Sequence, residues 1–211
     1  WAAVGGSQRR TLIGGFASSP RNHWNREMVE PYRLSFTTGG LFINESEDAA
    51  RRYLQAGNWD AARSEVRTQN TLQVRTAAAA LRISKEIVAR LETLSKEEVS
   101  FLVECSATDR VHLLWSAVSR RYIFIQEFAR DVLREHFVLM RRQILLSDFD
   151  AFYNQKALWH PELDQLAKST QSKLRQNLFR MMRDAGYIND QYTIAPAMLT
   201  PALAQLLAKN G

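Results

Sequence analysis

Signals that begin helices recur along the chain from Asn44 onward, and the segments between them carry apolar residues three and four positions apart. Ser95 and Glu98, for example, have the capping-box spacing, in which each side chain satisfies a backbone N–H of the other residue. Such a chain buries its apolar side chains between helices, so the sequence predicts a mainly helical, all-α protein. The predicted helices are 44–56, 59–68, 72–94, 95–104 and 108–136, followed by helices that begin near 147, 162, 171 and 201.

The apolar period also predicts which side chains of the two longest helices are buried. The stripe predicted for 72–94 consists of Ala77, Leu81, Val88 and Leu91. In 108–136 the stripe extends to His136, which is therefore expected to be a core residue. Polar residues at 119–121 interrupt this second stripe, and we expect a kink or a break there.

The last third of the chain has a different pattern. A helix predicted over 171–185 is closed by Gly186, and two short apolar segments, 187–188 and 192–194, follow on either side of a polar turn. A last helix begins at Pro201. The order of helix, helix, small β-hairpin and helix predicts a C-terminal winged helix-turn-helix element.

These patterns divide the chain into three parts. Residues 1–30 are basic and rich in glycine and show no helical period, so we expect an extension outside the core, with Met28 a candidate translation start. Residues 31–145 are expected to form a helical body, and 146–211 the winged-helix-like region.

Composition limits the chemistry of the partners. Lys and Arg number 28 against 22 Asp and Glu, and the resulting net charge of +6 favours a polyanionic partner. Cys105 is the only cysteine, which excludes an internal disulfide and fits a reducing cytoplasm. No apolar run approaches the roughly 18 residues that cross a bilayer, so we expect no membrane insertion.

The predicted helix 171–185 carries the strongest candidate site. Its apolar residues fall on one face, while the opposite face carries Lys173, Gln176, Arg180 and Arg183. A recognition helix needs this arrangement, because one face packs on the scaffold while long donors on the other reach phosphates and base edges. The alternative is a solvated helix face, or a winged helix that docks a protein.

A second basic set lies in the helix pair 59–94, which has the pattern of another helix-turn-helix. Its candidate nucleic-acid-binding residues are Arg75, Arg82 and Lys85. The alanines at 77–80 leave a second interpretation open, since alanine runs also mark tight packing of two helices. A third group, the arginines around 108–142, is better explained by ion pairs with neighbouring carboxylates on a solvated surface.

Catalytic and metal-binding patterns are missing from the sequence. The four histidines have no metal-ligand spacing, there is no cysteine cluster, and neither a GxSxG elbow nor a glycine-rich phosphate loop occurs. We therefore predict no catalytic residue, no metal and no cofactor.

Several motifs in consistent order resemble the BrxA family of bacteriophage-exclusion (BREX) defence systems. The matching stretches are YRLSFTTGG at 32–40, NWD at 58–60, NTLQVRTAAAALR at 70–82, EIVARLETL at 86–94, LW at 114–115, FARDVLR at 128–134, DFDAF at 148–152 and residues 169–186. The resemblance spans about 31–208. It implies a helical body like that of the transcription antitermination protein NusB, an accessory protein without known enzymatic activity, and binding to double-stranded DNA.

Together these observations predict a non-catalytic, cytoplasmic protein that binds double-stranded DNA and works with other BREX proteins. One alternative is a NusB-like RNA-binding protein. The other is an adaptor whose exposed aromatic residues dock other BREX proteins without touching nucleic acid. The sequence leaves the oligomeric state open.

Overall fold

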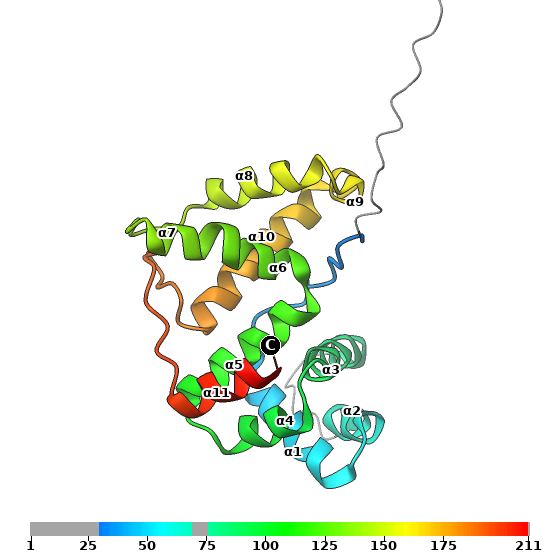
Figure 1. Cartoon of the computed structure of the whole chain (residues 1–211). Coiled ribbons are helices and arrows are strands. Elements are labelled where there is room, and N and C mark those ends of the chain that lie inside the picture. Colours follow the sequence, from blue (N-terminus) through cyan, green and yellow to red (C-terminus); the bar gives the residue numbers. More distant parts are fainter. Residues whose placement is uncertain (1–29, 69–75, 211) are drawn as a thin grey trace, which may run out of the picture.

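The computed structural model of the chain describes residues 30–68 and 76–210, except for the side chains of 65–68. These residues are mainly helical, as predicted, and none of them forms a β-strand (Figure 1). No helix among them combines the length and the apolar character that crossing a membrane needs. The elements are α1 (Ile43–Ala56), α2 (Trp59–Thr68), α3 (Ala77–Leu91), α4 (Lys96–Glu104), α5 (Ala107–Arg121), α6 (Ile123–Phe128), the π-helix η1 (Ala129–Arg134), α7 (Glu135–Val138), α8 (Leu146–Ala157), α9 (Pro161–Asp164), α10 (Lys168–Asp184) and α11 (Pro201–Asn210).

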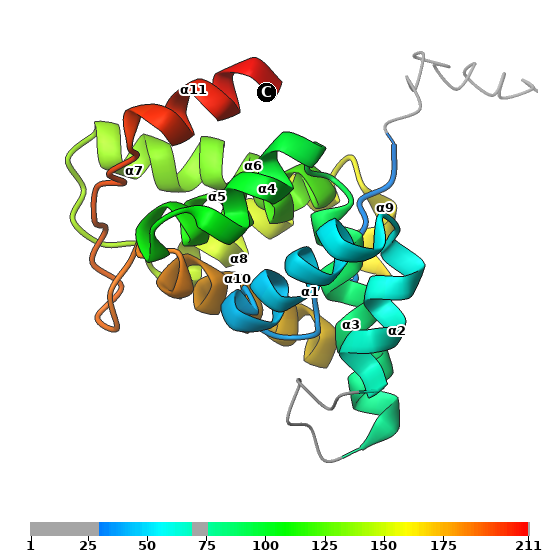
Figure 2. The ribbon, with the colours of Figure 1, turned by 90° about the horizontal axis from the view of Figure 1, so that it is seen from below.

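The helices form two tiers, with α1–α5 below and α6–α10 above in the view of Figure 1. The chain passes from one tier to the other where α5 runs into α6. The last helix, α11, returns to the lower tier and lies beside α4 and α5 (Figures 1 and 2). Its position is fixed by Thr200, whose hydroxyl donates to the Asp109 carboxylate at 2.9 Å, and by an ion pair of 2.6 Å between Lys209 and Glu97.

Local capping signals placed some helix ends correctly. The Asn58 side chain accepts from the Ala61 N–H, and Ser95 and Glu98 form the predicted capping box. The starts predicted at 44 and 108 are each one residue late, since α1 begins at Ile43 without a side-chain cap and Ser106 caps α5, which begins at Ala107. A cap contributes about 1 kcal/mol, less than the burial of one large apolar side chain, so packing decides the start where several polar residues compete.

The predicted break in the longest apolar segment is confirmed. α5 ends at Arg121, and Tyr122 has extended dihedral angles before α6 begins. The Tyr122 ring is fully buried, and its hydroxyl donates to the Glu86 carboxylate and lies 3.2 Å from the Ser35 hydroxyl. These contacts hold the side chain inside the molecule at the cost of a regular helix.

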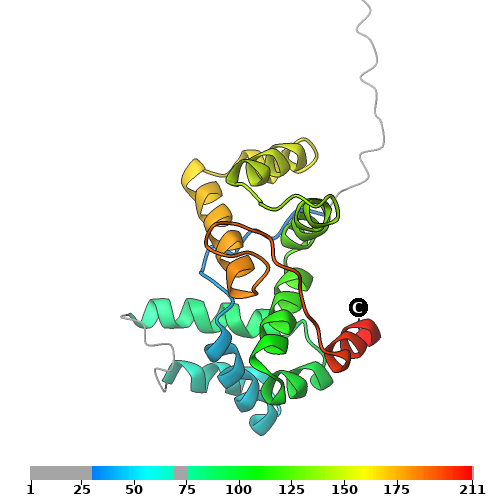
Figure 3. The same cartoon turned by 90° about the vertical axis from the view of Figure 1, so that its left-hand side faces the viewer.

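Burial agrees with the sequence pattern in the inner part of α3 only. Val88 and Leu91 are buried, but Ala77 and Leu81 are exposed, Leu81 by 46%. The first turns of α3 lie at the edge of the molecule beside α2, where Ala80 is buried but Ala77 and Leu81 stay exposed (Figure 3). His136 is not a full core residue either, since it is only partly buried at the start of α7 and its Nδ1 is 3.2 Å from the Gln143 carbonyl oxygen.

The predicted β-hairpin after α10 is reduced to a turn without strands. Single antiparallel bridges join Ile188 to Ile194 and Thr193 to Gln143. The Asn189 side chain accepts from the backbone N–H groups of both Gln191 and Thr193, and so takes hydrogen bonds that a longer ladder would use. The all-α prediction is thus confirmed, whereas a winged helix with a β-hairpin is not observed in the described residues.

An extended segment before α1, which we call the strap (residues 30–42), runs between the two tiers. Phe36 and Leu41 of the strap are buried in the core, and the Tyr32 ring stacks on His160 with centroids 3.7 Å apart. The Phe36 carbonyl accepts from the Asn177 side chain of α10 at 3.0 Å. The strap therefore connects the tiers directly, although its residues show no regular apolar pattern.

Candidate nucleic-acid interface

α10 has the two faces that its sequence predicts. Leu174, Leu178 and Met181 are buried, while Lys173, Gln176 and Arg180 on the opposite face are exposed. Neither Lys173 nor Arg180 forms an ion pair with an acidic residue in the described part of the chain. The outward face therefore presents two cations and an amide, as contact with an anionic backbone requires, although the Arg180 Nε lies near the Asp184 carboxylate beside Gly40.

Arg183 differs from the other predicted contact residues of this helix. It is half-buried, its guanidinium lies 5.9 Å from the centre of the Tyr192 ring, and its Nε is 3.8 Å from the Asp190 carboxylate. Asp190 is 90% exposed, so this long ion pair is weak and leaves most of the charge available. Arg183 can contribute to the positive potential, but its side chain is already packed against the turn.

The residues at the two ends of α10 determine where the helix begins and ends. The helix begins at Lys168 after Ala167, without a side-chain cap and three residues before the predicted start at 171. The Ala167 carbonyl already accepts from the N–H groups of Thr170 and Gln171. The predicted end is confirmed, since Gly186 adopts φ 75°, a left-handed conformation that glycine reaches without a steric penalty.

The second predicted set lies on α3. Arg82 and Lys85 are exposed and have no ion pair with any acidic residue that the structure describes, whereas Arg75 lies outside the described residues. The connection 69–75 of the predicted helix-turn-helix at 59–94 also lies outside them. Within the part of the chain that the structure describes, α3 therefore supplies two unpaired cations to the surface.

Four arginines around the long helical segment pair with carboxylates, Arg130 and Arg134 with the neighbours that the sequence suggested and Arg110 and Arg120 with distant ones. Arg120 pairs with Glu98, Arg110 with Glu47, and Arg130 with Asp131. Arg134 also forms an ion pair of 3.4 Å with its neighbour Glu135. These four charges stabilise or solvate the fold, whereas Arg142 of the same group is exposed and has no ion pair among the described residues.

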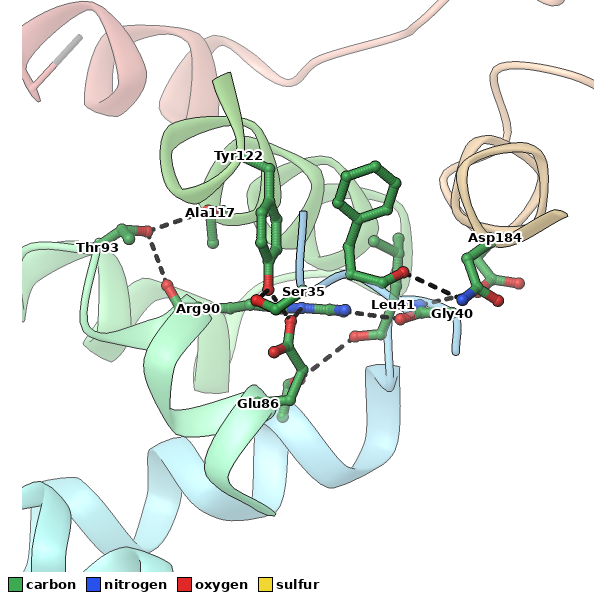
Figure 4. Close-up of polar contacts among 12 residues, drawn as sticks. Ser35, Gly40, Leu41, Glu86, Arg90, Thr93, Ala117, Tyr122 and Asp184 are labelled. Atoms are coloured by element: carbon green, nitrogen blue, oxygen red, sulfur yellow. Dashed lines mark hydrogen bonds and ion pairs between the residues drawn. The ribbon is translucent and has the colours of Figure 1, made fainter. Parts of the chain in front are cut away.

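The strap joins the two basic helices at Gly40 and Leu41, a place we call the junction (Figure 4). Arg90 of α3 donates from Nη1 to the Gly40 carbonyl at 2.7 Å, and Asp184 of α10 accepts from the Leu41 N–H at 2.9 Å. A Cβ added to Gly40 would lie 3.0 Å from the Arg180 Nε. Sequence reasoning missed this junction. Its one signal was the Glu86–Arg90 pair, with i,i+4 spacing on a buried face.

A different surface at the end of α7 is apolar. Phe137, Val138, Leu139 and Met140 are 50–84% exposed, and Met140 has a left-handed φ of 57°. Beside them, a groove of about 340 Å³ lies between η1 and residues 194–197, with Trp115 and Phe137 among its lining residues. Exposed apolar patches of this kind occur at protein-binding surfaces.

Titratable groups in the described residues serve structural contacts. His112 lies 3.3 Å from the Tyr187 hydroxyl, and burial lowers the pKa of His112. His160 contacts the Glu162 carboxylate at 2.9 Å. Within residues 30–68 and 76–210 no three His, Cys, Asp or Glu side chains are grouped as metal ligands.

Comparison with known proteins places these features in a family. A family model described as BrxA matches residues 30–211. A "BREX protein BrxA" of Paramagnetospirillum magneticum is 26% identical over 167 residues, which cover 79% of this chain and 84% of the relative. A protein of the same name from Escherichia coli (strain HS) is 24% identical over 151 residues, covering 72% of this chain and 71% of the relative.

A solved structure has a similar fold. It is described as an uncharacterized protein from Magnetospirillum magneticum, is 24% identical, and superimposes with a TM-score of 0.75 over 85% of this chain and 93% of that chain. The likeness supports the helical architecture.

Proposed function

The chain belongs to the BrxA family, and from this premise we propose that it is a non-catalytic component of a BREX system that binds double-stranded DNA through α10. The name of both relatives supports the assignment to a BREX system. The observation that carries DNA binding is the outward face of α10, where Lys173, Gln176 and Arg180 are exposed and no described carboxylate pairs with the two cations.

The chemistry of this face suits a duplex. Lys173 and Arg180 are seven residues apart, or two helical turns, which corresponds to about 10 Å along the axis. Flexible ammonium and planar guanidinium groups at that spacing reach phosphates, and Gln176 between them offers both a donor and an acceptor to a base edge. The buried opposite face holds the helix in place while the outward face makes contact.

The turn after α10 would add contacts beside the helix, in the role of a wing. Arg142 lies next to it, because its carbonyl accepts from the Ile194 N–H at 2.8 Å. Arg142 is itself exposed. In this proposal the turn and Arg142 contact the backbone of the duplex, and α10 enters the groove.

The test is a gel-shift titration over a range of salt concentrations with duplex DNA and structured RNA in parallel. Replacement of Lys173, Arg180 and Arg183 by alanine is expected to weaken duplex binding and to lower the salt dependence by about one phosphate contact per residue removed. Unchanged affinity of this variant would remove α10 from the interface. Displacement of duplex DNA by RNA would favour the alternative of a NusB-like RNA-binding protein.

A second candidate function, an adaptor between BREX proteins, is favoured by the apolar surface at 137–140. Phe137 and Met140 would enter the core of a protein interface, where aromatic and methionine side chains are enriched. One experiment distinguishes DNA binding from the adaptor function. Co-purification with another BREX protein that is lost on replacing Phe137 by serine, together with no salt-dependent retention on DNA, would support the adaptor.

A further inference from the structure

We infer that the free cations of α3 and α10 form one continuous interface for a single duplex, centred on the junction at Gly40 and Leu41. This inference rests on the proposed function and adds that Arg82 and Lys85 contact the same DNA molecule as Lys173 and Arg180. Nothing in the sequence pattern connects the two sets, which are almost ninety residues apart.

On α10, a row of side chains connects the exposed face to the junction. Arg180 and Asp184 are separated by four residues, so they lie one above the other on the helix. The Asp184 carboxylate accepts a hydrogen bond from the Leu41 N–H, and the Arg180 Nε lies beside Gly40. The line of residues that begins at Lys173 therefore ends on the strap.

A matching line on α3 ends at the same place. Arg82, Glu86 and Arg90 have i, i+4, i+8 spacing and so share one side of that helix. Arg90 donates to the Gly40 carbonyl, and Glu86 binds both Arg90, at 2.8 Å, and the buried Tyr122 hydroxyl. Arg82, one turn beyond Glu86, lies where this line leaves the core and becomes exposed.

The acidic residues along the two lines do not cancel the free cations. Glu86 is buried and paired with Arg90, while the Asp184 carboxylate accepts from the backbone of Leu41. Both carboxylates are committed to the junction. Among the described residues, Lys173 and Arg82 at the outer ends of the lines have no ion-pair partner, whereas Arg180 lies close to the Asp184 carboxylate beside Gly40.

The dimensions suit one duplex segment. The rise of an α-helix places Lys173 about 16 Å from Asp184 along α10, and Arg82 about 12 Å from Arg90 along α3. α3 extends outward below α10 on the same side of the molecule (Figure 3). The path from Lys173 through the junction to Arg82 is thus roughly 30 Å, close to one turn of B-DNA, whose phosphates supply one charge per about 1.7 Å of axis.

The experiment uses the full chain and one hairpin duplex of about 12 base pairs, long enough for one such footprint. Two double variants are compared, Arg82→Gln with Lys85→Gln and Lys173→Gln with Arg180→Gln, because glutamine removes the charge and keeps a long polar side chain. A control for the loss of two charges, Lys96→Gln with Lys209→Gln, removes two exposed cations of α4 and α11, of which Lys209 is paired with Glu97. Helix content and the thermal midpoint verify that each variant is folded.

One interface predicts the same response from both double variants. Each should weaken binding by about tenfold or more at ~0.1 M salt and reduce the slope of log affinity against log salt by about two, at one duplex per chain. A variant that combines all four substitutions should lose nearly four units of slope. The Lys96/Lys209 control should bind like the wild type.

The outcomes separate this inference from the function on which it rests. If the wild type shows no salt-dependent duplex binding, the proposed function fails. If the wild type binds and the Lys173/Arg180 variant is impaired, but the Arg82/Lys85 variant matches the control, the single interface is overturned while DNA binding by α10 stands. Two duplexes bound per chain would overturn it as well.

Discussion

Replacing the buried carboxylate Glu98 by glutamine should destabilise the fold far more than the same change at its neighbour Glu97. Glu98 is fully buried and Arg120 donates to both of its oxygens, at 2.8 and 2.9 Å. The Ser95 N–H donates to the same carboxylate at 2.7 Å. One side chain thus pairs an arginine and caps α4, and its substitution affects both contacts.

The expected loss in the free energy of unfolding follows from how exposed Glu98 and Arg120 are. Removing one member of a buried ion pair costs about 3–5 kcal/mol because the other charge stays desolvated. The Arg120 side chain retains 22% exposure, and glutamine at 98 keeps an oxygen for the Ser95 N–H, so we expect about 3 kcal/mol for Glu98→Gln. For a domain of about 200 residues this corresponds to a fall in Tm of about 6–12 °C.

The assay is urea and thermal unfolding of Glu98→Gln and Glu97→Gln, which carry the same change in charge one position apart. Glu97 and its partner Lys209 are both more than half exposed, so the control should lose less than about 1 kcal/mol. If the two variants unfold within about 1 kcal/mol of each other, the buried pair does not stabilise the fold as reasoned here.

The pH dependence gives a second check on the same residue. Burial alone would raise the pKa of Glu98, but hydrogen bonds from Arg120 and Ser95 outweigh it and hold the pKa below its ordinary 4.5. A carboxyl group with a lowered pKa in the folded state stabilises the fold above the unfolded pKa and loses that effect as the pH falls through the folded one. The difference between wild type and Glu98→Gln should therefore be full at pH 7 and shrink as the pH falls below about 4.5.

Two further substitutions test the strap and the turn after α7. Gly40→Ala should lower the free energy of unfolding in urea by about 2 kcal/mol. The new Cβ would lie 2.1 Å from the Asp184 Oδ2 and displace this oxygen from the Leu41 N–H. Unchanged stability would contradict this reasoning. Met140→Gly should raise the free energy of unfolding by about 0.5–1 kcal/mol, because Met140 has a left-handed φ of 57°, which glycine adopts without strain. Its side chain is 84% exposed, so little packing is lost. A loss of stability would show that the side chain packs.

Features that depend on a few neighbouring residues could be predicted from the sequence. The capping box at Ser95, the left-handed Gly186 and the break near Tyr122 each follow from local backbone chemistry or from a local gap in the apolar period. The exposure of Lys173 and Arg180 also follows, because the same period that buries Leu178 turns them outward.

Features that depend on distant residues could not be predicted. The strap has no period, and its partners are far along the chain: Glu162 is 130 positions from Tyr32, and Asp184 is 143 from Leu41. The half-burial of Arg183 depends on the turn that brings Tyr192 beneath it, and the turn geometry is set by Asn189 rather than by strand pairing. In each case a single side chain reaches backbone that local patterns do not place.

The position of the unpaired charges, rather than their number, decides which surface can meet a polyanion. A net charge of +6 is modest for 211 residues, and several arginines outside the two basic faces are bound to carboxylates, Arg175 to Asp150 among them. On α10 and α3 the nearby carboxylates Asp184 and Glu86 are instead drawn to the junction by the Leu41 N–H and by Arg90. The contacts that lock the strap between the tiers thereby also leave the outer cations free, so the same residues that orient the two helices expose their charge.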